Sequence, residues 1–115
     1  MRVISTIPLI ENATAAVVSD TVLNSSADEM TVQIFGTATA LQLKAQGLTD
    51  IDSNDWQDIA SFNLTDLSLA DGSTGMTSLG IFSVPVAGLR LVRLNLVSVT
   101  GSLSATASFA DTSAQ

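Results

Sequence analysis

The chain has 115 residues, which is the usual size of a single domain. Hydrophobic residues make up 46% of it and charged residues 13%, so the chain can bury one apolar core without disulfide bonds. Eleven acidic residues against four basic ones give a formal charge of −7, which repels the phosphates of nucleic acids and anionic lipids. We therefore expect neither nucleic acid nor a membrane as a partner.

Missing residue types restrict the chemistry of the chain further. The chain has no Cys and no His, which removes thiolate nucleophiles, the commonest general base and the commonest metal ligands. Ser and Thr hydroxyls are weak nucleophiles when no base lies beside them. The sequence therefore predicts that the protein is not an enzyme and has no catalytic residues, no cofactor and no metal.

The first expected strand covers residues 2–9 and is apolar on both of its faces. Ser5, Thr6 and Pro8 make it too short and too polar for a signal peptide or a membrane span, which predicts a soluble, unsecreted protein. Because an apolar edge strand needs a cover, residues 1–10 are expected either to be buried in the domain or to pair, as an edge strand or arm, with a neighbouring chain. The candidate interface residues are Arg2, Val3, Ile4, Ile7 and Arg90.

Three further strands are expected in the first half of the chain, at residues 14–23, 30–35 and 41–46. The third shows the clearest alternation. Leu41, Leu43 and Ala45 face one way, and Gln42, Lys44 and Gln46 face the other. This period of two is typical of a strand with one buried and one solvated face.

The densest acidic segment, residues 49–58, follows these strands. Asp50, Asp52 and Asn54 stand at alternate positions, as ligands do in a calcium-binding loop, but the Gly and Glu required at later positions are missing. We therefore expect a solvated connection, with an irregular cation site as the alternative. Trp56 ends this loop, where it either packs on the end of the domain or stacks on a sugar ring.

The second half of the chain predicts strands at residues 56–64, 79–86, 91–97 and 103–109. In the last of these, apolar and hydroxyl side chains alternate strictly. Leu103, Ala105, Ala107 and Phe109 form one face, and Ser104, Thr106 and Ser108 form the other. The hydroxyl face is expected to meet solvent or a partner.

Eight short strands with no helical period predict an all-β protein. Turn-forming residues at 24–26, 50–55 and 70–75 separate the strands. The expected fold is a single domain over residues 1–115, an eight-stranded antiparallel jelly-roll-like β-sandwich.

Several strand and turn segments resemble small structural proteins of tailed bacteriophages. These segments are residues 31–37, 41–47, 55–60, 80–89 and 92–102. With its length, its acidity and its lack of catalytic residues, the chain resembles the capsid decoration proteins, of the staple or cement type, of short-tailed phages such as epsilon fifteen.

This resemblance implies a viral structural protein on the outer surface of the virion's capsid. Such a protein would clamp neighbouring major capsid subunits, which would be its partners, and would form a homodimer. Two alternatives stay open: a phage tail or head-fibre module, and a bacterial carbohydrate-binding β-sandwich. Both would use a polar and aromatic patch, for which Trp56 and the acidic loop are the only support in the sequence.

Overall fold

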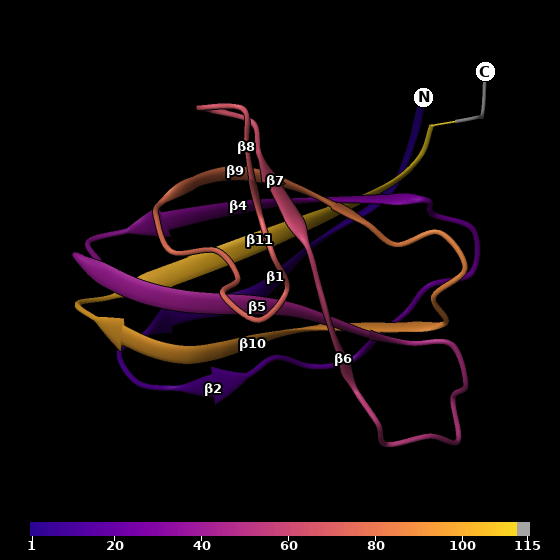
Figure 1. The fold of residues 1–115 in the computed structure, drawn as a ribbon, viewed down its shortest axis with the longest axis horizontal. Coiled ribbons are helices and arrows are strands. Elements are labelled where there is room, and N and C mark those ends of the chain that lie inside the picture. Colours follow the sequence, from indigo (N-terminus) through magenta and orange to yellow (C-terminus); the bar gives the residue numbers. More distant parts are fainter. Residues whose placement is uncertain (113–115) are drawn as a thin grey trace.

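The computed structural model of the protein describes residues 1–112, which form two antiparallel β-sheets packed face to face (Figure 1). The all-β sandwich predicted from the sequence is confirmed. This described part of the chain holds no helix, and so none that is long and apolar enough to cross a membrane.

The two sheets have six and five strands. The six-stranded sheet has the order β1 (Arg2–Ala13), β11 (Leu103–Asp111), β4 (Glu29–Gly36), β9 (Gly80–Pro85), β7 (Ser61–Asn63) and β8 (Ser68–Ala70). The five-stranded sheet has the order β2 (Val17–Val18), β10 (Leu91–Thr100), β5 (Ala40–Leu48) and β6 (Gln57–Ile59), and β3 (Val22–Leu23) also pairs with β10. In Figure 1, β4, β11 and β1 lie in the upper layer, and β5, β10 and β2 lie in the lower one.

The core between the sheets consists largely of the inward-facing side chains predicted from the alternation. All the expected inward positions of β5, β10 and β11 are buried. They are Leu41, Leu43, Ala45, Val92, Leu94, Leu96, Leu103, Ala105, Ala107 and Phe109. Each buried Leu or Val contributes about 1.5–3 kcal/mol through the hydrophobic effect, so the middle strands of both sheets supply most of the driving force.

Two of the expected strands are divided in the structure. Residues 14–23 form the short strands β2 and β3, and residues 56–64 form β6 and β7, which belong to different sheets. The chain passes from one sheet to the other at Ala60, a crossing that leaves no mark on the local sequence pattern. The sequence also did not predict β8, so eight expected segments become eleven strands among residues 1–112.

The centre of the sandwich is a two-stranded ribbon folded across both sheets. β4 pairs with β11 in one sheet, and β5 pairs with β10 in the other. The chain crosses between the sheets at residues 37–39 and again at residues 101–102. These crossings bind each other, because the Thr37 N–H donates to the Ser102 carbonyl and the Thr39 N–H to the Thr100 carbonyl. Both N···O distances are 2.9 Å. The two sheets are thus joined at one corner.

Gly36 and Gly101 allow the two crossings to lie this close. Their φ angles are 127° and 98°, in the region that disfavours any side chain. A Cβ atom on Gly36 would lie 2.5 Å from the carbonyl oxygen of Ser102, and one on Gly101 would lie 2.9 Å from that of Thr37. Both positions therefore need glycine for backbone conformation and for space.

Asn24 is a buried polar residue at the opposite end of β4. Its Nδ2 group donates to the carbonyl oxygens of Ala27, Val86 and Leu89 at 3.0 to 3.2 Å, and its Oδ1 accepts the N–H of Ala27 at 3.0 Å. The residue is 6% exposed, and every polar atom of its side chain is bonded. It therefore holds the start of β4 against the end of β9.

Replacing Gly36 by Ala should destabilise the fold by at least about 2 kcal/mol, because a strained φ costs about 1–3 kcal/mol and the new Cβ also meets a backbone oxygen. Gly88→Ala is the matched control, since Gly88 also has a positive φ, of 81°, but no atom lies within 4 Å of its Cβ position. Urea unfolding followed by circular dichroism measures both variants. Equal losses of the free energy of unfolding in the Gly36→Ala and Gly88→Ala variants would contradict a tightly packed corner.

Candidate functional site

β1 forms an open edge of the six-stranded sheet. It pairs with β11 along its length, and no strand within residues 1–112 pairs with its other side. Burial changes along it: Ile10 is 4% exposed, whereas Val3 and Ile4 are 58% and 40% exposed. Of the two alternatives that the sequence left open, burial in the domain therefore applies to only one half of the strand. Its second half belongs to the core, and its first half is uncovered.

The five candidate interface residues are divided between two places. Arg2, Val3 and Ile4 are exposed on the uncovered half of β1, and Ile7 is half-buried against the core. Arg90 is exposed in the loop that precedes β10, a strand of the other sheet. The structure therefore brings four of these residues together on β1 and leaves Arg90 outside that group.

A row of polar side chains crosses the outer face of the five-stranded sheet. Arg93 of β10, Gln46 of β5 and Asp58 of β6 are direct cross-strand neighbours. Arg93 Nε donates to Gln46 Oε1 at a distance of 2.9 Å, and Gln46 Nε2 donates to Asp58 Oδ1 at a distance of 2.8 Å. The Lys44 ammonium donates to the other Asp58 oxygen over 3.2 Å. The row fastens the short strand β6 to its sheet.

Trp56 packs against this row. The guanidinium carbon of Arg93 lies 4.1 Å from the centroid of the indole ring, which is a cation–π contact. Trp56 is therefore a packing residue, but its partner is an arginine and not the core, and the covered ring face is not open to a sugar. Sequence reasoning missed the row because its members come from three separate strands; their outward positions were the available signal.

The acidic loop of residues 49–58 is stabilised by its own turns. Asp50 Oδ1 accepts a hydrogen bond from the N–H of Asp52 at 2.9 Å, and Ser53 Oγ accepts one from the N–H of Asp55 at 3.1 Å. Within residues 1–112, no three His, Cys, Asp or Glu side chains lie together in a way that could hold a metal ion. Asp50 thus has a turn-forming role here.

Three carboxyl groups have a lowered pKa because they accept hydrogen bonds. The pKa of Asp58 is lowered chiefly by the hydrogen bond from Gln46, with smaller effects from the hydrogen bond and charge of Lys44, while burial acts in the opposite direction. These contacts favour the ionised carboxylate, as its place in the polar row requires.

The other two, Asp28 and Asp71, have a lowered pKa through contacts with nearby Ser and Thr residues. The Thr112 hydroxyl, followed by the Thr112 N–H, lowers the pKa of Asp28. The Thr74 N–H, followed by the Ser73 hydroxyl, lowers the pKa of Asp71. Both carboxylates therefore serve local structure in their ionised form.

Two solved structures have this fold. YomS, a protein derived from the SPBc2 prophage, matches with a TM-score of 0.77 and 23% sequence identity, over 91% of this chain and 90% of YomS. The exported protein XepA of PBSX matches with a TM-score of 0.73 and 22% identity, over 91% of this chain and 37% of XepA. At these identities the likeness shows the fold, and this chain spans well under half the length of XepA.

The sequence itself decides the family. The sequence model of the XepA family matches residues 4–107, which is nearly the whole sandwich. The chain belongs to the XepA family. A comparison with curated protein sequences gives no match. Of the two solved structures with this fold, YomS is named a prophage-derived protein and XepA an exported protein.

This assignment overturns the resemblance to capsid decoration proteins of the epsilon fifteen type, which is wrong. The matches name the XepA family and an exported protein, and they give no support for a location on the capsid or for a capsid-stapling function. The physical reason lies in the segments that carried the resemblance. They form β4, β5, β6, β9 and β10 with their turns, elements that any antiparallel sandwich contains.

Acid should destabilise the fold through Asp28, Asp58 and Asp71. Because their folded pKa values lie below the ordinary 3.8, their stabilising effect is complete above about pH 4. It is lost as the pH falls through the lowered values, where the folded protein must take up protons. Urea unfolding at a series of pH values measures the free energy of unfolding, which should fall less below about pH 4 for Asp58→Asn than for the wild type. The same fall of this free energy with pH in both proteins would contradict this account.

Proposed function

We propose that the chain is a non-enzymatic assembly module that joins further copies of itself through the first half of β1. The open edge carries this proposal. The outer side of β1 has no strand partner within residues 1–112, and the apolar side chains of Val3 and Ile4 are exposed beside it. An unpaired apolar edge is a template for a strand from another chain, and a second copy supplies such a strand.

The geometry of β1 favours its first half as the pairing segment. Pro8 has no N–H to donate, and the register with β11 shifts on both sides of Ile10. Irregular edges of this kind resist pairing. The first half contains no proline and one register shift, between Val3 and Ser5. Residues 2–7 are therefore the part of the edge best suited to accept another strand.

The form of the assembly depends on which edge meets β1. Pairing of β1 with β1 of a second copy is symmetric and gives a homodimer. Pairing of β1 with β8, the opposite edge of the same sheet, is head-to-tail and gives a ring when the rotation closes. β8 offers three residues, whereas residues 2–7 of β1 form a longer pairing segment, which favours the symmetric pairing.

The charged groups support a binding role. The lowered pKa values of Asp28, Asp58 and Asp71 keep these carboxylates ionised, whereas a general acid needs a pKa near the working pH. The formal charge of −7 supports a protein partner over nucleic acid or an anionic membrane.

The printed name of one neighbour supports a proposal for the place of action. XepA is named an exported protein, and we propose the same for this chain. This differs from the unsecreted protein that the N-terminal sequence predicts. Detection of the chain outside the cells that express it, with a cytosolic marker as the control for lysis, tests this part of the proposal.

Replacing Val3 by Lys should weaken self-association at least about tenfold, because it places a charge in the apolar contact. Size-exclusion chromatography with light scattering, over a series of protein concentrations, measures the effect and the number of copies. Val18→Lys is the matched control, since Val18 is 47% exposed on β2, a strand of the other sheet. A monomeric wild type, or equal effects of the two substitutions, would contradict the proposal.

A further inference from the structure

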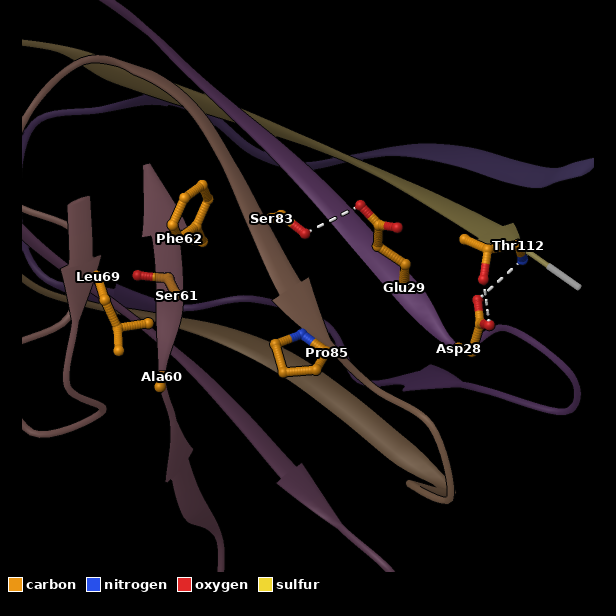
Figure 2. A pocket seen from close by; sticks show the side chains of 9 residues that line it. All are labelled: Asp28, Glu29, Ala60, Ser61, Phe62, Leu69, Ser83, Pro85 and Thr112. Atoms are coloured by element: carbon orange, nitrogen blue, oxygen red, sulfur yellow. Dashed lines mark hydrogen bonds between the residues drawn. The ribbon is translucent and has the colours of Figure 1, made fainter. Parts of the chain in front are cut away.

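The outer face of the six-stranded sheet carries almost no charge. Alternation along β4, β7, β8, β9 and β11 points every second side chain to this face. Among these outward positions, all within residues 1–112, only Glu29 is charged, whereas the whole chain has a formal charge of −7. In Figure 2, Phe62 on β7, Ser83 on β9 and Glu29 on β4 follow one another across this face. Two copies of the acidic chain therefore repel each other least here.

Part of this face is apolar and exposed. Phe62 and Leu69 are cross-strand partners on β7 and β8, and Leu69 is 74% exposed. Leu64 and Ile81 are also exposed, and the Leu64 N–H donates to the Ile81 carbonyl at 2.9 Å. Large apolar side chains that are exposed on neighbouring strands form one continuous patch, which is typical of a contact between proteins.

The turn between β7 and β8 carries a strained leucine. Leu67 has a φ of 60°, in the left-handed region that disfavours residues with a Cβ atom, and its N–H donates to the Asn63 carbonyl at 2.8 Å. Leu67 is 71% exposed, so the fold gains little burial in return for this strain. In Figure 1, the turn stands above the layer that contains β4. An exposed, strained leucine on a projecting turn is suited to a contact outside its own chain.

A hollow of about 320 Å³ lies at the opposite end of the same hairpin (Figure 2). It opens where β7 separates from β9, because β7 pairs with β9 only at Phe62 and Asn63, whereas β9 continues to Pro85. Its apolar walls are Ala60, Phe62, Leu69 and Pro85. An apolar projection and an apolar hollow thus lie at the two ends of β7 and β8.

We propose that two copies of the chain pack face to face through this surface. A two-fold axis that crosses β7 at Phe62, perpendicular to the strand and in the plane of the contact, places the turn of each copy over the hollow of the other. Leu67 of each copy then packs on Phe62 and Pro85 of the second copy. A projection and a hollow at opposite ends of one hairpin make the surface complementary to itself, which a two-fold contact requires.

The size of the face fits a dimer. The five strands, about 4.8 Å apart and about 20 Å long, present roughly 500 Å² per copy. Two copies then bury about 1,000 Å² in total, which is the lower limit for a specific interface. A bilayer fits this surface less well. Asp66 lies in the projecting turn, and the outward side chains of Thr31 and Gln33 would lose water in a membrane.

The face contact is separate from the pairing of β1. β1 and β8 are the two edges of this sheet, and a second copy on the outer face leaves the edge of β1 free. One copy can therefore use both contacts at once. Each contact alone gives a dimer, and the two together give assemblies larger than a dimer.

The test is sedimentation velocity over a series of concentrations, on the full chain with Val3→Lys, which weakens the pairing of β1. This protein should form a dimer with a Kd on the order of 10 µM, as fits a contact of this size. Adding Ile81→Lys should raise that Kd at least about tenfold, because it places a charge in the apolar contact. Val97→Lys is the matched control: Val97 is 41% exposed, against 39% for Ile81, and lies on β10 of the other sheet.

Leu67→Gly separates the contact from the stability of the fold. Glycine adopts a positive φ without strain, so this substitution should not lower the melting temperature. It removes the side chain that enters the hollow, so it should raise the Kd of the dimer about threefold or more. A lower melting temperature with an unchanged Kd would show that Leu67 serves the fold, and would overturn its role in the contact.

The outcomes distinguish the face contact from the pairing of β1. A wild type that associates, with a Val3→Lys chain that is monomeric over the whole series, would overturn the face contact and support the pairing of β1. Association that Val3→Lys leaves unchanged and Ile81→Lys abolishes would do the reverse. Equal Kd values with Ile81→Lys and Val97→Lys would overturn the face contact. So would binding to phosphatidylcholine vesicles that Ile81→Lys abolishes, which would assign the face to a membrane.

Discussion

The fold depends on the corner where the two crossings between the sheets bind each other. Because Thr37 and Thr39 are hydrogen-bonded to Ser102 and Thr100, the pairing of β4 with β11 fixes the pairing of β5 with β10. A register slip of one residue in either pair would turn apolar side chains toward solvent in both sheets. The other strands are added to this ribbon: β1, β9, β7 and β8 to one sheet, and β2, β3 and β6 to the other.

The parts of the fold that alternate strictly were predictable from the sequence, and the parts that cross between sheets were not. The pattern of β11, with Leu103 through Phe109 inward and hydroxyls outward, needs no information beyond the segment itself. Residues 56–64 carry a similar local pattern but change sheets at Ala60, because their partners are β5 on one side of that residue and β9 on the other. Only long-range pairing determines such a division.

The functional surfaces follow the same rule. The apolar character of residues 2–9 is a local property, and the sequence therefore indicated an edge or a buried strand; its division into a covered and an uncovered half depends on β11 and the core. The contact of Arg93 with Trp56 and the hydrogen bonds of Gln46 join residues from separate segments of the chain. The family assignment likewise came from the match over residues 4–107, because the strand and turn segments that suggested a capsid protein are shared by many sandwiches.

The order of the strands in the chain has a kinetic consequence. β11 lies between β1 and β4 in the sheet. Neither β1 nor β4 can form its hydrogen bonds on that side until β11, which begins at residue 103, has been synthesised. Closing loops of this length is slow, and on the ribosome β1 and β4 emerge long before the strand that joins them. Until then both strands expose unpaired edges. The nascent chain therefore stays accessible to chaperones, and the sandwich closes only after β11 has been released from the ribosome.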